Sequence, residues 1–241
     1  MTNKKAVFFD LDGTLLPVDP DTMFGPYFEL LKKSEIMQLI AADTEDAFRI
    51  FMEAASYMME NRGGDTNEGA FLAYIEKAAG RKREHLKEPL NRFYGTVFDF
   101  LTGVVQKKGI QRRIVHTVRQ KGYKTVLATM PVFPLTAAVS RLSSVGLRPE
   151  DFHYISHYGN STYLKPHPEY YQEILSKIHL DGKDCIMVGN NIKEDMVAQN
   201  LGFDVFLVTG HEIGEYKKDD YTSGDLRALF EWACGLPRAE V

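Results

Sequence analysis

From residue 110 to residue 234, short apolar runs alternate with segments of helical periodicity. The apolar runs predict strands over residues 124–129, 152–156, 185–189 and 204–209. The segments between and around them predict helices over residues 110–121, 135–145, 168–178, 192–201 and 226–234. An earlier apolar run at residues 6–9 predicts one more buried strand. Strands that alternate with helices through short loops are typical of an α/β fold, here a Rossmann-like, mainly parallel sheet.

The stretch from residue 18 to residue 106 has a different character. It lacks strand-like runs of β-branched residues and carries helical periodicity over residues 27–40, 45–60, 68–79 and 84–105. We therefore expect an all-helical cap subdomain at residues 18–106, inserted into an α/β catalytic core of residues 1–17 and 107–241. Within the cap, the run Tyr57-Met58-Met59 is expected to pack between helices or against the core.

The composition argues against several classes of protein. The chain of 241 residues has a formal net charge of -4, which gives no support for nucleic-acid binding or a membrane-surface role. The apolar run at residues 6–9 is too short for a signal-peptide core, and no segment is long enough to span a bilayer. The two cysteines, Cys185 and Cys234, predict neither a disulfide framework nor a metal site. We expect a cytoplasmic protein, and the oligomeric state stays open.

The first predicted strand runs directly into Asp10-Leu11-Asp12-Gly13-Thr14. Residues i and i+2 of an extended segment point the same way, so both carboxylates can face one pocket where Gly13 turns the chain. Two acids so close raise each other's proton affinity unless a cation lies between them, and Mg²⁺ prefers such oxygen ligands. Asp10 is then a candidate nucleophile and Asp12 a candidate proton carrier. Taken alone, the motif is more often an acidic turn that caps the next segment.

Polar residues also follow the next two predicted strands. Thr129 ends one strand and precedes Met130, so a hydroxyl and a backbone N–H are available to hold phosphoryl oxygens. Lys165 follows the other strand in the run Lys165-Pro166-His167-Pro168, where the prolines restrict the chain around a cation that can neutralise phosphate. Each signal is weak alone, since a strand-end Thr is usually a turn residue and most lysines are solvated.

The strand predicted at residues 185–189 ends in an oxygen-rich turn. Asn190 and Asn191 follow it at once, and Glu194 and Asp195 come shortly after. Oxygen side chains at this spacing can complete the ligand shell of a metal ion. The alternative is an Asn helix cap followed by acids that favour a helix N-terminus.

An acidic pair, a hydroxyl, a lysine and an oxygen-rich turn, each after a successive strand, resemble the four motifs of the haloacid dehalogenase (HAD) superfamily. The helical insert after the first motif is similar to the cap that many members place there. Two positions depart from the family pattern: Asn190 stands where Asp is usual, and Met130 stands where many relatives have Asn. The first departure predicts weaker metal binding, and the second predicts a less polar pocket.

The resemblance implies a Mg²⁺-dependent phosphatase that acts on a small phosphorylated metabolite through an aspartyl-phosphate. It implies Asp10 as the nucleophile and Asp12 as the general acid and base. The remaining implied site residues are, for phosphate, Leu11, Thr129, Met130 and Lys165, and for the metal, Asp10, Asp12, Asn190, Asn191 and Asp195. Two alternatives stay open: a phosphomutase with the same intermediate, and a non-catalytic phosphate-binding regulatory protein. Dehalogenation is disfavoured because a halide leaving group needs no Asp12.

Overall fold

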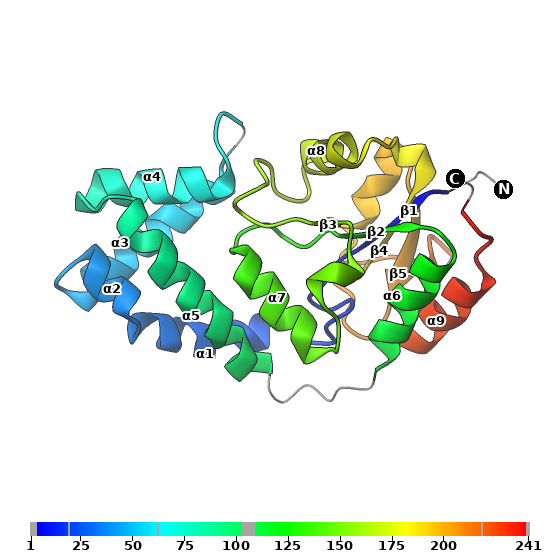
Figure 1. Cartoon of the computed structure of the whole chain (residues 1–241), viewed down its shortest axis with the longest axis horizontal. Helices are drawn as coiled ribbons and strands as arrows, with labels where there is room; N and C mark the ends of the chain where they lie inside the picture. Colours follow the sequence, from blue (N-terminus) through cyan, green and yellow to red (C-terminus); the bar gives the residue numbers. More distant parts are fainter. Residues whose placement is uncertain (1–3, 19, 62, 103–108, 218, 240–241) are drawn as a thin grey trace.

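The protein, seen here in a computed structural model, is described at residues 4–18, 20–61, 63–102, 109–217 and 219–239. Within these ranges six parallel strands form one sheet, in the order β3-β2-β1-β4-β5-β6, with helices on both faces (Figure 1). The strands are β1 (Ala6–Phe9), β2 (Lys124–Leu127), β3 (Tyr154–Ile155), β4 (Cys185–Gly189), β5 (Asp204–Val208) and β6 (Thr222–Gly224). This arrangement confirms the predicted α/β, Rossmann-like parallel fold.

The strand order reverses next to β1. The chain passes from β1 outward to β2 and β3, and then crosses back to β4, β5 and β6 on the other side. Phe9, the last residue of β1, is paired with Leu127 of β2 and Val188 of β4, so the three strands end close together. In open parallel sheets, ligands bind outside the carboxyl ends of the strands at such a reversal. The residues after Phe9 therefore occupy the expected position of a binding site.

Two hydrophobic layers hold helices against the sheet. Alternate side chains of a strand point to opposite faces, so Val7 and Phe9 face one layer while Ala6 and Phe8 face the other. The first layer packs against α6 (Ile110–Gln120), α7 (Leu135–Ser144) and α9 (Leu226–Gly235). The second packs against α8 (Pro168–Ile178) and the 3₁₀ helix η3 (Met196–Leu201). Two shorter 3₁₀ helices complete this part, η1 (Pro149–Asp151) and η2 (Gly182–Asp184).

Five helices form a separate layer at one end of the molecule, away from the two chain ends (Figure 1). They are α1 (Pro20–Lys32), α2 (Glu35–Ile40), α3 (Thr44–Met59), α4 (Asn67–Ala79) and α5 (Glu84–Thr102). Their apolar faces share a hydrophobic cluster of their own, and α5 packs along α7 of the sheet part. We refer to α1–α5 as the cap. The predicted cap boundary near Val18 precedes α1, and the one at Gln106 lies outside the described residues.

One helix predicted as continuous forms two separate helices in the structure. Residues 27–40 were expected to be continuous, but α1 ends at Lys32 and α2 begins at Glu35. The Ser34 hydroxyl donates to the Leu31 carbonyl (2.7 Å), so a side chain takes the place of a continuing helical hydrogen bond. Among the described residues, no helix is long and apolar enough to cross a membrane.

A second correction concerns the predicted helix over residues 192–201. Only its second half is helical, as the 3₁₀ helix η3. The Asp195 carboxylate accepts hydrogen bonds from the backbone N–H groups of Asn190 (3.1 Å) and Asn191 (3.0 Å), which favours a turn over a helix there. The structure also contains β6, which the sequence analysis missed because its Thr-Ser-Gly sequence has no apolar pattern.

Candidate active site

Asp10 follows the central strand β1 and lies at the centre of the candidate site. Its Oδ1 atom accepts a hydrogen bond from Lys165 Nζ (2.8 Å), and its Oδ2 atom accepts one from the Thr14 hydroxyl (3.1 Å). The loop after β1 then turns at Gly13, whose φ is +81°. A Cβ atom at Gly13 would lie 2.2 Å from Asn190 Nδ2, so this loop packs directly on the turn after β4. Asp10 is thereby held between the loops that follow β1 and β4, at the carboxyl end of the sheet strands.

Lys165 connects two carboxylates. Its Nζ atom donates to Asp10 Oδ1 (2.8 Å) and to Asp195 Oδ1 (2.6 Å), and the Lys165 side chain is only 1% exposed. Burial alone would lower the pKa of Lys165, but the two carboxylates raise it well above its usual value. Lys165 is therefore a permanent cation next to Asp10.

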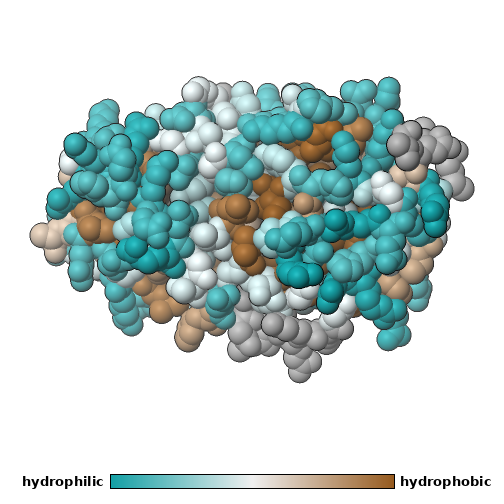
Figure 2. Space-filling view, viewed as in Figure 1, coloured by the Kyte–Doolittle hydropathy of each residue, from teal (hydrophilic) through white to brown (hydrophobic). Residues whose placement is uncertain are grey.

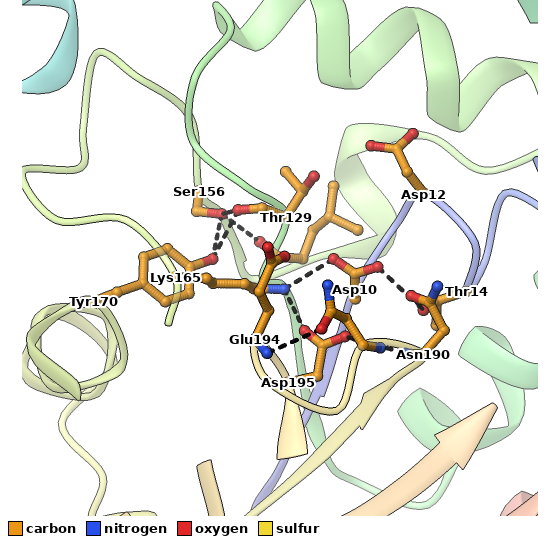
Figure 3. Close-up of polar contacts among 12 residues, drawn as sticks. Asp10, Asp12, Thr14, Thr129, Ser156, Lys165, Tyr170, Asn190, Glu194 and Asp195 are labelled. Carbon is orange, nitrogen blue, oxygen red and sulfur yellow. Dashed lines mark hydrogen bonds and ion pairs between the residues drawn. The ribbon is translucent and has the colours of Figure 1, made fainter. Parts of the chain in front are cut away.

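Asp12 points elsewhere. Figure 3 shows its carboxylate turned away from the cluster of Asp10, Lys165 and Asp195. One oxygen of Asp12 is paired with the guanidinium of Arg141 on α7, whereas Oδ1 has no hydrogen-bond partner among the described residues. Burial raises the pKa of Asp12, Arg141 opposes that rise, and Asp10 adds to it. The two acids of the first motif thus line one cavity with different cationic partners.

Thr129 lies beyond the end of β2. Its backbone carbonyl is hydrogen-bonded, whereas its side-chain hydroxyl has no hydrogen-bond partner among the described residues. Its carbonyl accepts hydrogen bonds from the hydroxyls of Ser156 (2.9 Å) and Tyr170 (2.9 Å), which Figure 3 shows beside it. Its buried Oγ1 atom has no partner within the described part of the chain, and Thr129 lines the same cavity as Asp10. A buried hydroxyl without a partner is uncommon and calls for a ligand or a water molecule. The sequence had no signal for the supporting roles of Ser156 and Tyr170.

Two backbone N–H groups that were predicted to hold phosphate also lie at the carboxyl end of the strands. No hydrogen bond within the described ranges uses the backbone N–H of Leu11 or Met130. The Leu11 side chain is fully buried in the core under the sheet, whereas the Met130 side chain lines the cavity. These positions leave both amides free to meet oxyanions, and Met130 makes the cavity wall less polar, as expected from the sequence.

The turn after β4 is held by side chains that were predicted to bind metal. Asn190 Oδ1 accepts from the Thr14 hydroxyl (2.9 Å), and its Nδ2 donates to the carbonyl of His211 (2.6 Å). Asn191 Oδ1 accepts from two backbone N–H groups two and three positions further on, at 3.0 and 3.2 Å. Asp195 uses both oxygens, one for Lys165 and one for the turn. These contacts hold the loop in place, but no helix begins at Asn190 or Asn191, so the helix-cap alternative is wrong in its detail.

The charges of the cavity nevertheless suit a divalent cation. Four carboxyl groups line it, those of Asp10, Asp12, Glu194 and Asp195, against the two cations of Lys165 and Arg141. Burial raises the pKa of Glu194, Lys165 opposes that rise, and Asp10 adds to it. Burial also raises the pKa of Asp195, to about 7, against the effect of Lys165. A divalent cation would stabilise the ionised form of these carboxyls and balance their formal excess of two negative charges.

No three His, Cys, Asp or Glu side chains in the described ranges form a ready-made metal cage. Mg²⁺ seldom needs one, because it is commonly held by one or two carboxylates together with waters and substrate phosphate. The donor set of Asp10 and Glu194, at the edge of one cavity, fits that mode of binding.

Arg141 is a site residue that the sequence analysis did not identify. Its side chain is 3% exposed, and its guanidinium carbon lies 4.8 Å from the ring centre of Phe98 on α5 and 5.6 Å from that of Phe133. The available signal was its position four residues after Ala137, on the buried face of a helix that has no other charged residue. A buried arginine without a partner is costly, so an acidic partner could have been expected.

A cavity of about 630 Å³ joins these residues to the cap. Its floor holds the charged residues at the sheet edge, and its walls come from cap helices and from the loop after β2. Figure 2 shows apolar side chains gathered in the middle of the molecule, between the cap and the sheet part. Of the run expected to pack, Met58 does pack in the hydrophobic cluster of the cap and also lines the cavity. Met59 lines the cavity although it is 58% exposed, and Tyr57 is 52% exposed and lies against Tyr74.

Comparison with known protein families identifies one family. The family model described as haloacid dehalogenase-like hydrolase matches residues 4–210. No curated protein matches the chain. A HAD phosphatase from Thermococcus onnurineus has a TM-score of 0.56 at 17% identity, and the match covers 98% of this chain and 100% of that one.

Two further crystal structures, one of a hydrolase and one of a dehalogenase, show the same fold. The HAD-hydrolase YfnB from Bacillus subtilis, bound to magnesium, has a TM-score of 0.52 at 15% identity, covering 96% of this chain and 99% of that one. A 2-haloacid dehalogenase from Pseudomonas syringae pv. Tomato DC3000 has a TM-score of 0.58 at 16% identity, covering 95% and 99%. At these identities the similarity shows the fold alone, and proteins described as phosphatases and as dehalogenases share that fold.

Proposed function

The chain belongs to the haloacid dehalogenase-like hydrolases, and from that premise we propose that it is a Mg²⁺-dependent phosphatase of a small phosphorylated metabolite. The observation that carries the proposal is the buried Thr129 hydroxyl, which has no partner among the described residues and lines the same cavity as the Asp10–Lys165 pair. A phosphoryl group above Asp10 would supply the missing acceptor for Thr129 and a third anionic partner for Lys165.

In the proposed reaction, a carboxylate oxygen of Asp10 attacks phosphorus and the bond to the leaving oxygen breaks. The products of this step are an aspartyl-phosphate on Asp10 and an alcohol, which takes its proton from Asp12. Asp12 then removes a proton from water, which attacks the phosphorus, releases inorganic phosphate and restores the Asp10 carboxylate. Lys165, Thr129 and the amides of Leu11 and Met130 stabilise the charge on the phosphoryl oxygens.

A bound Mg²⁺ ion would reduce the repulsion between the Asp10 carboxylate and the phosphate dianion. Asp10 and Glu194 are the side chains that we assign to it, since Asp10 is the proposed nucleophile and, among the described residues, no hydrogen bond or ion pair engages the Glu194 carboxylate, which lines the same cavity. The excess of acidic groups in the cavity supports this assignment. The metal roles first predicted for Asp12, Asn191 and Asp195 stay predictions, and the titration described in the Discussion tests that of Asn190.

Dehalogenation is the competing reaction within the family, and Asp12 argues against it. A halide leaves as an anion and needs no proton, whereas an alkoxide leaving group does. The test is the release of inorganic phosphate from p-nitrophenyl phosphate and from a panel of phosphometabolites, with Mg²⁺ and with a chelator, beside chloride release from 2-chloropropionate.

We expect phosphate release that the chelator abolishes and no chloride release. Chloride release without phosphate release would overturn the proposal. Conversion of a sugar phosphate to its isomer, with little free phosphate, would favour the mutase alternative. Phosphate binding without turnover would favour the regulatory alternative.

A further inference from the structure

The cap side of the cavity differs chemically from its floor. Every side chain that the described cap residues contribute to the cavity wall is apolar or aromatic, including Tyr27, Phe51, Met52, Met58 and Tyr94. The charged residues of the cavity all come from the sheet part, at the floor. The organic group of any phosphate ester bound at Asp10 would therefore enter a wall without charged side chains.

The two tyrosine hydroxyls in this wall pair with each other, which leaves at most one O–H of the pair for a ligand. Tyr27 and Tyr94 form a hydrogen bond with each other, with an oxygen–oxygen distance of 2.6 Å. Both side chains are buried, and burial raises the pKa of each hydroxyl, so they remain neutral. The pair thus presents ring surface to the cavity.

One further polar atom borders the cavity. Outside the floor, the Tyr158 hydroxyl is the buried side-chain atom of the lining without a well-placed hydrogen-bond partner in the described ranges, although the Glu68 carboxylate on α4 lies close enough to help raise the pKa of Tyr158. A ligand could satisfy it with a single hydrogen-bonding group. A polyol, a sugar or a second carboxylate would bring more polar groups than this wall can pair.

The free-energy cost of burying unpaired polar groups against this wall determines which substrates bind well. A polar group buried without a hydrogen bond costs about 1–3 kcal/mol by protein mutational data, so each unpaired hydroxyl lowers affinity by about fivefold or more. A buried methylene does the opposite and raises affinity by up to about fourfold. Methionines at Met52, Met58 and Met130 add flexible, polarisable surface that adapts to ligands of different shape.

We propose that the substrates of this site are phosphate monoesters whose organic group is predominantly apolar, alkyl or aryl, with room for one hydrogen-bonding group. This inference rests on the proposed phosphatase function and specifies its substrate class. The cavity of about 630 Å³ lies within the range of small-molecule sites, so the organic group can be well larger than a short acid or triol.

The first test compares esters that differ in their organic group alone. Ethyl, propyl, butyl and hexyl phosphate have alcohols of similar acidity, so differences in kcat/KM report binding of the chain. We expect kcat/KM to rise along this series by up to about fourfold per methylene. Propyl phosphate and glycerol 3-phosphate form a matched pair that differs by two hydroxyls, and we expect propyl phosphate to be hydrolysed at least about tenfold faster in kcat/KM.

A pair of variants on α3 locates the chain in the cavity. Ala55 lines the cavity, whereas its neighbour Ser56 is exposed and lies outside it. Ala55→Leu should lower kcat/KM for hexyl phosphate by about fivefold or more relative to that for ethyl phosphate, because the new side chain occupies the space of the longer chain. Ser56→Leu adds the same side chain to the solvent side of the helix and should alter neither.

Binding of phosphonates separates this inference from the proposed function. Methylphosphonate and hexylphosphonate cannot be hydrolysed, and calorimetry on the wild-type protein with Mg²⁺ measures their affinities without turnover. If small phosphates are hydrolysed but the alkyl series is flat, or glycerol 3-phosphate is preferred, the inference is wrong and the phosphatase stands. If nothing is hydrolysed but hexylphosphonate binds more tightly than methylphosphonate, the phosphatase proposal fails and the apolar ligand class stands. Absence of both effects overturns both.

Discussion

Arg141 on α7 and Asp12 after β1 form an ion pair that joins the catalytic loop to the cap side of the cavity. The guanidinium of Arg141 also lies against the ring of Phe98 on α5, so one side chain touches both parts of the molecule. Because Asp12 is the acid and base of the proposed reaction, its orientation depends on a residue far from it in sequence. Four predictions follow from the geometry around this pair and around Asp10.

Removal of Arg141 should destabilise the fold through Asp12. Arg141→Gln leaves a largely buried carboxylate without its cation, so we expect the free energy of unfolding to fall by about 2–4 kcal/mol. In the double variant with Asp12→Asn, the two losses should be less than additive by about 1–3 kcal/mol. Urea unfolding of the four proteins measures this coupling.

The matched control is Arg113→Gln. Arg113 also lies over an aromatic ring, that of Phe230 at 4.2 Å, but Arg113 is exposed. Its loss should cost less than about 1 kcal/mol. Additive losses at Arg141 and Asp12 would show that the ion pair contributes nothing to stability.

Asp10→Asn should abolish turnover while the protein stays folded. An amide is a far weaker nucleophile than a carboxylate, so no aspartyl-phosphate can form. Lys165 keeps its ion pair with Asp195 at 2.6 Å, so the buried cation retains a partner and the melting temperature should change little. Phosphate release and a thermal melt of the same preparation check both parts. Wild-type activity in this variant would end the covalent mechanism.

Asp12→Asn should affect poor leaving groups more than good ones. An aryl oxide leaves without much help from an acid, whereas an alkoxide needs a proton as it leaves. We expect kcat/KM, which does not include hydrolysis of the common intermediate, to fall by about 10²- to 10⁴-fold for hexyl phosphate, the usual range for loss of a general acid, and much less for p-nitrophenyl phosphate. Equal losses on both substrates would remove Asp12 from the acid role.

Asn190→Asp tests whether Asn190 binds the metal or positions the loop. As a ligand, the new carboxylate should lower the Mg²⁺ concentration for half-maximal activity. As a positioning residue, it should leave that concentration unchanged and destabilise the protein by about 1–3 kcal/mol, because the carbonyl of His211 loses its donor. The contacts of Asn190 lead us to expect the second result.

Asn191→Asp is the matched control for that titration. Its side-chain oxygen accepts two backbone N–H groups, a role that Asp can retain while adding the same charge nearby. If both variants lower the half-saturating Mg²⁺ concentration equally, the effect is one of general charge. If Asn190→Asp alone lowers it, the ligand role first predicted for Asn190 is correct.

The position of Asp10, Thr129 and Lys165 followed from the sequence alone because it depends on short-range rules. Each comes after an apolar run, and in a parallel sheet the carboxyl ends of the strands meet at one edge. The hydrophobic periodicity likewise determined the helical insert. The turn after β4 was misjudged as a helix, because the side-chain hydrogen bonds of Asp195 outweigh a helical apolar pattern.

Only the tertiary structure decided which partners these residues have. The pairing of Arg141 with Asp12 depends on the rotation of α7 and on its distance from the loop after β1, and neither is encoded in local periodicity. The sequence also does not determine which cap residues line the cavity. An apolar residue in an amphipathic helix can face either a hydrophobic core or a cavity, and the sequence pattern is identical for both. Met58 and Met59 became cavity residues because the packing of the cap against the sheet part leaves space beside them.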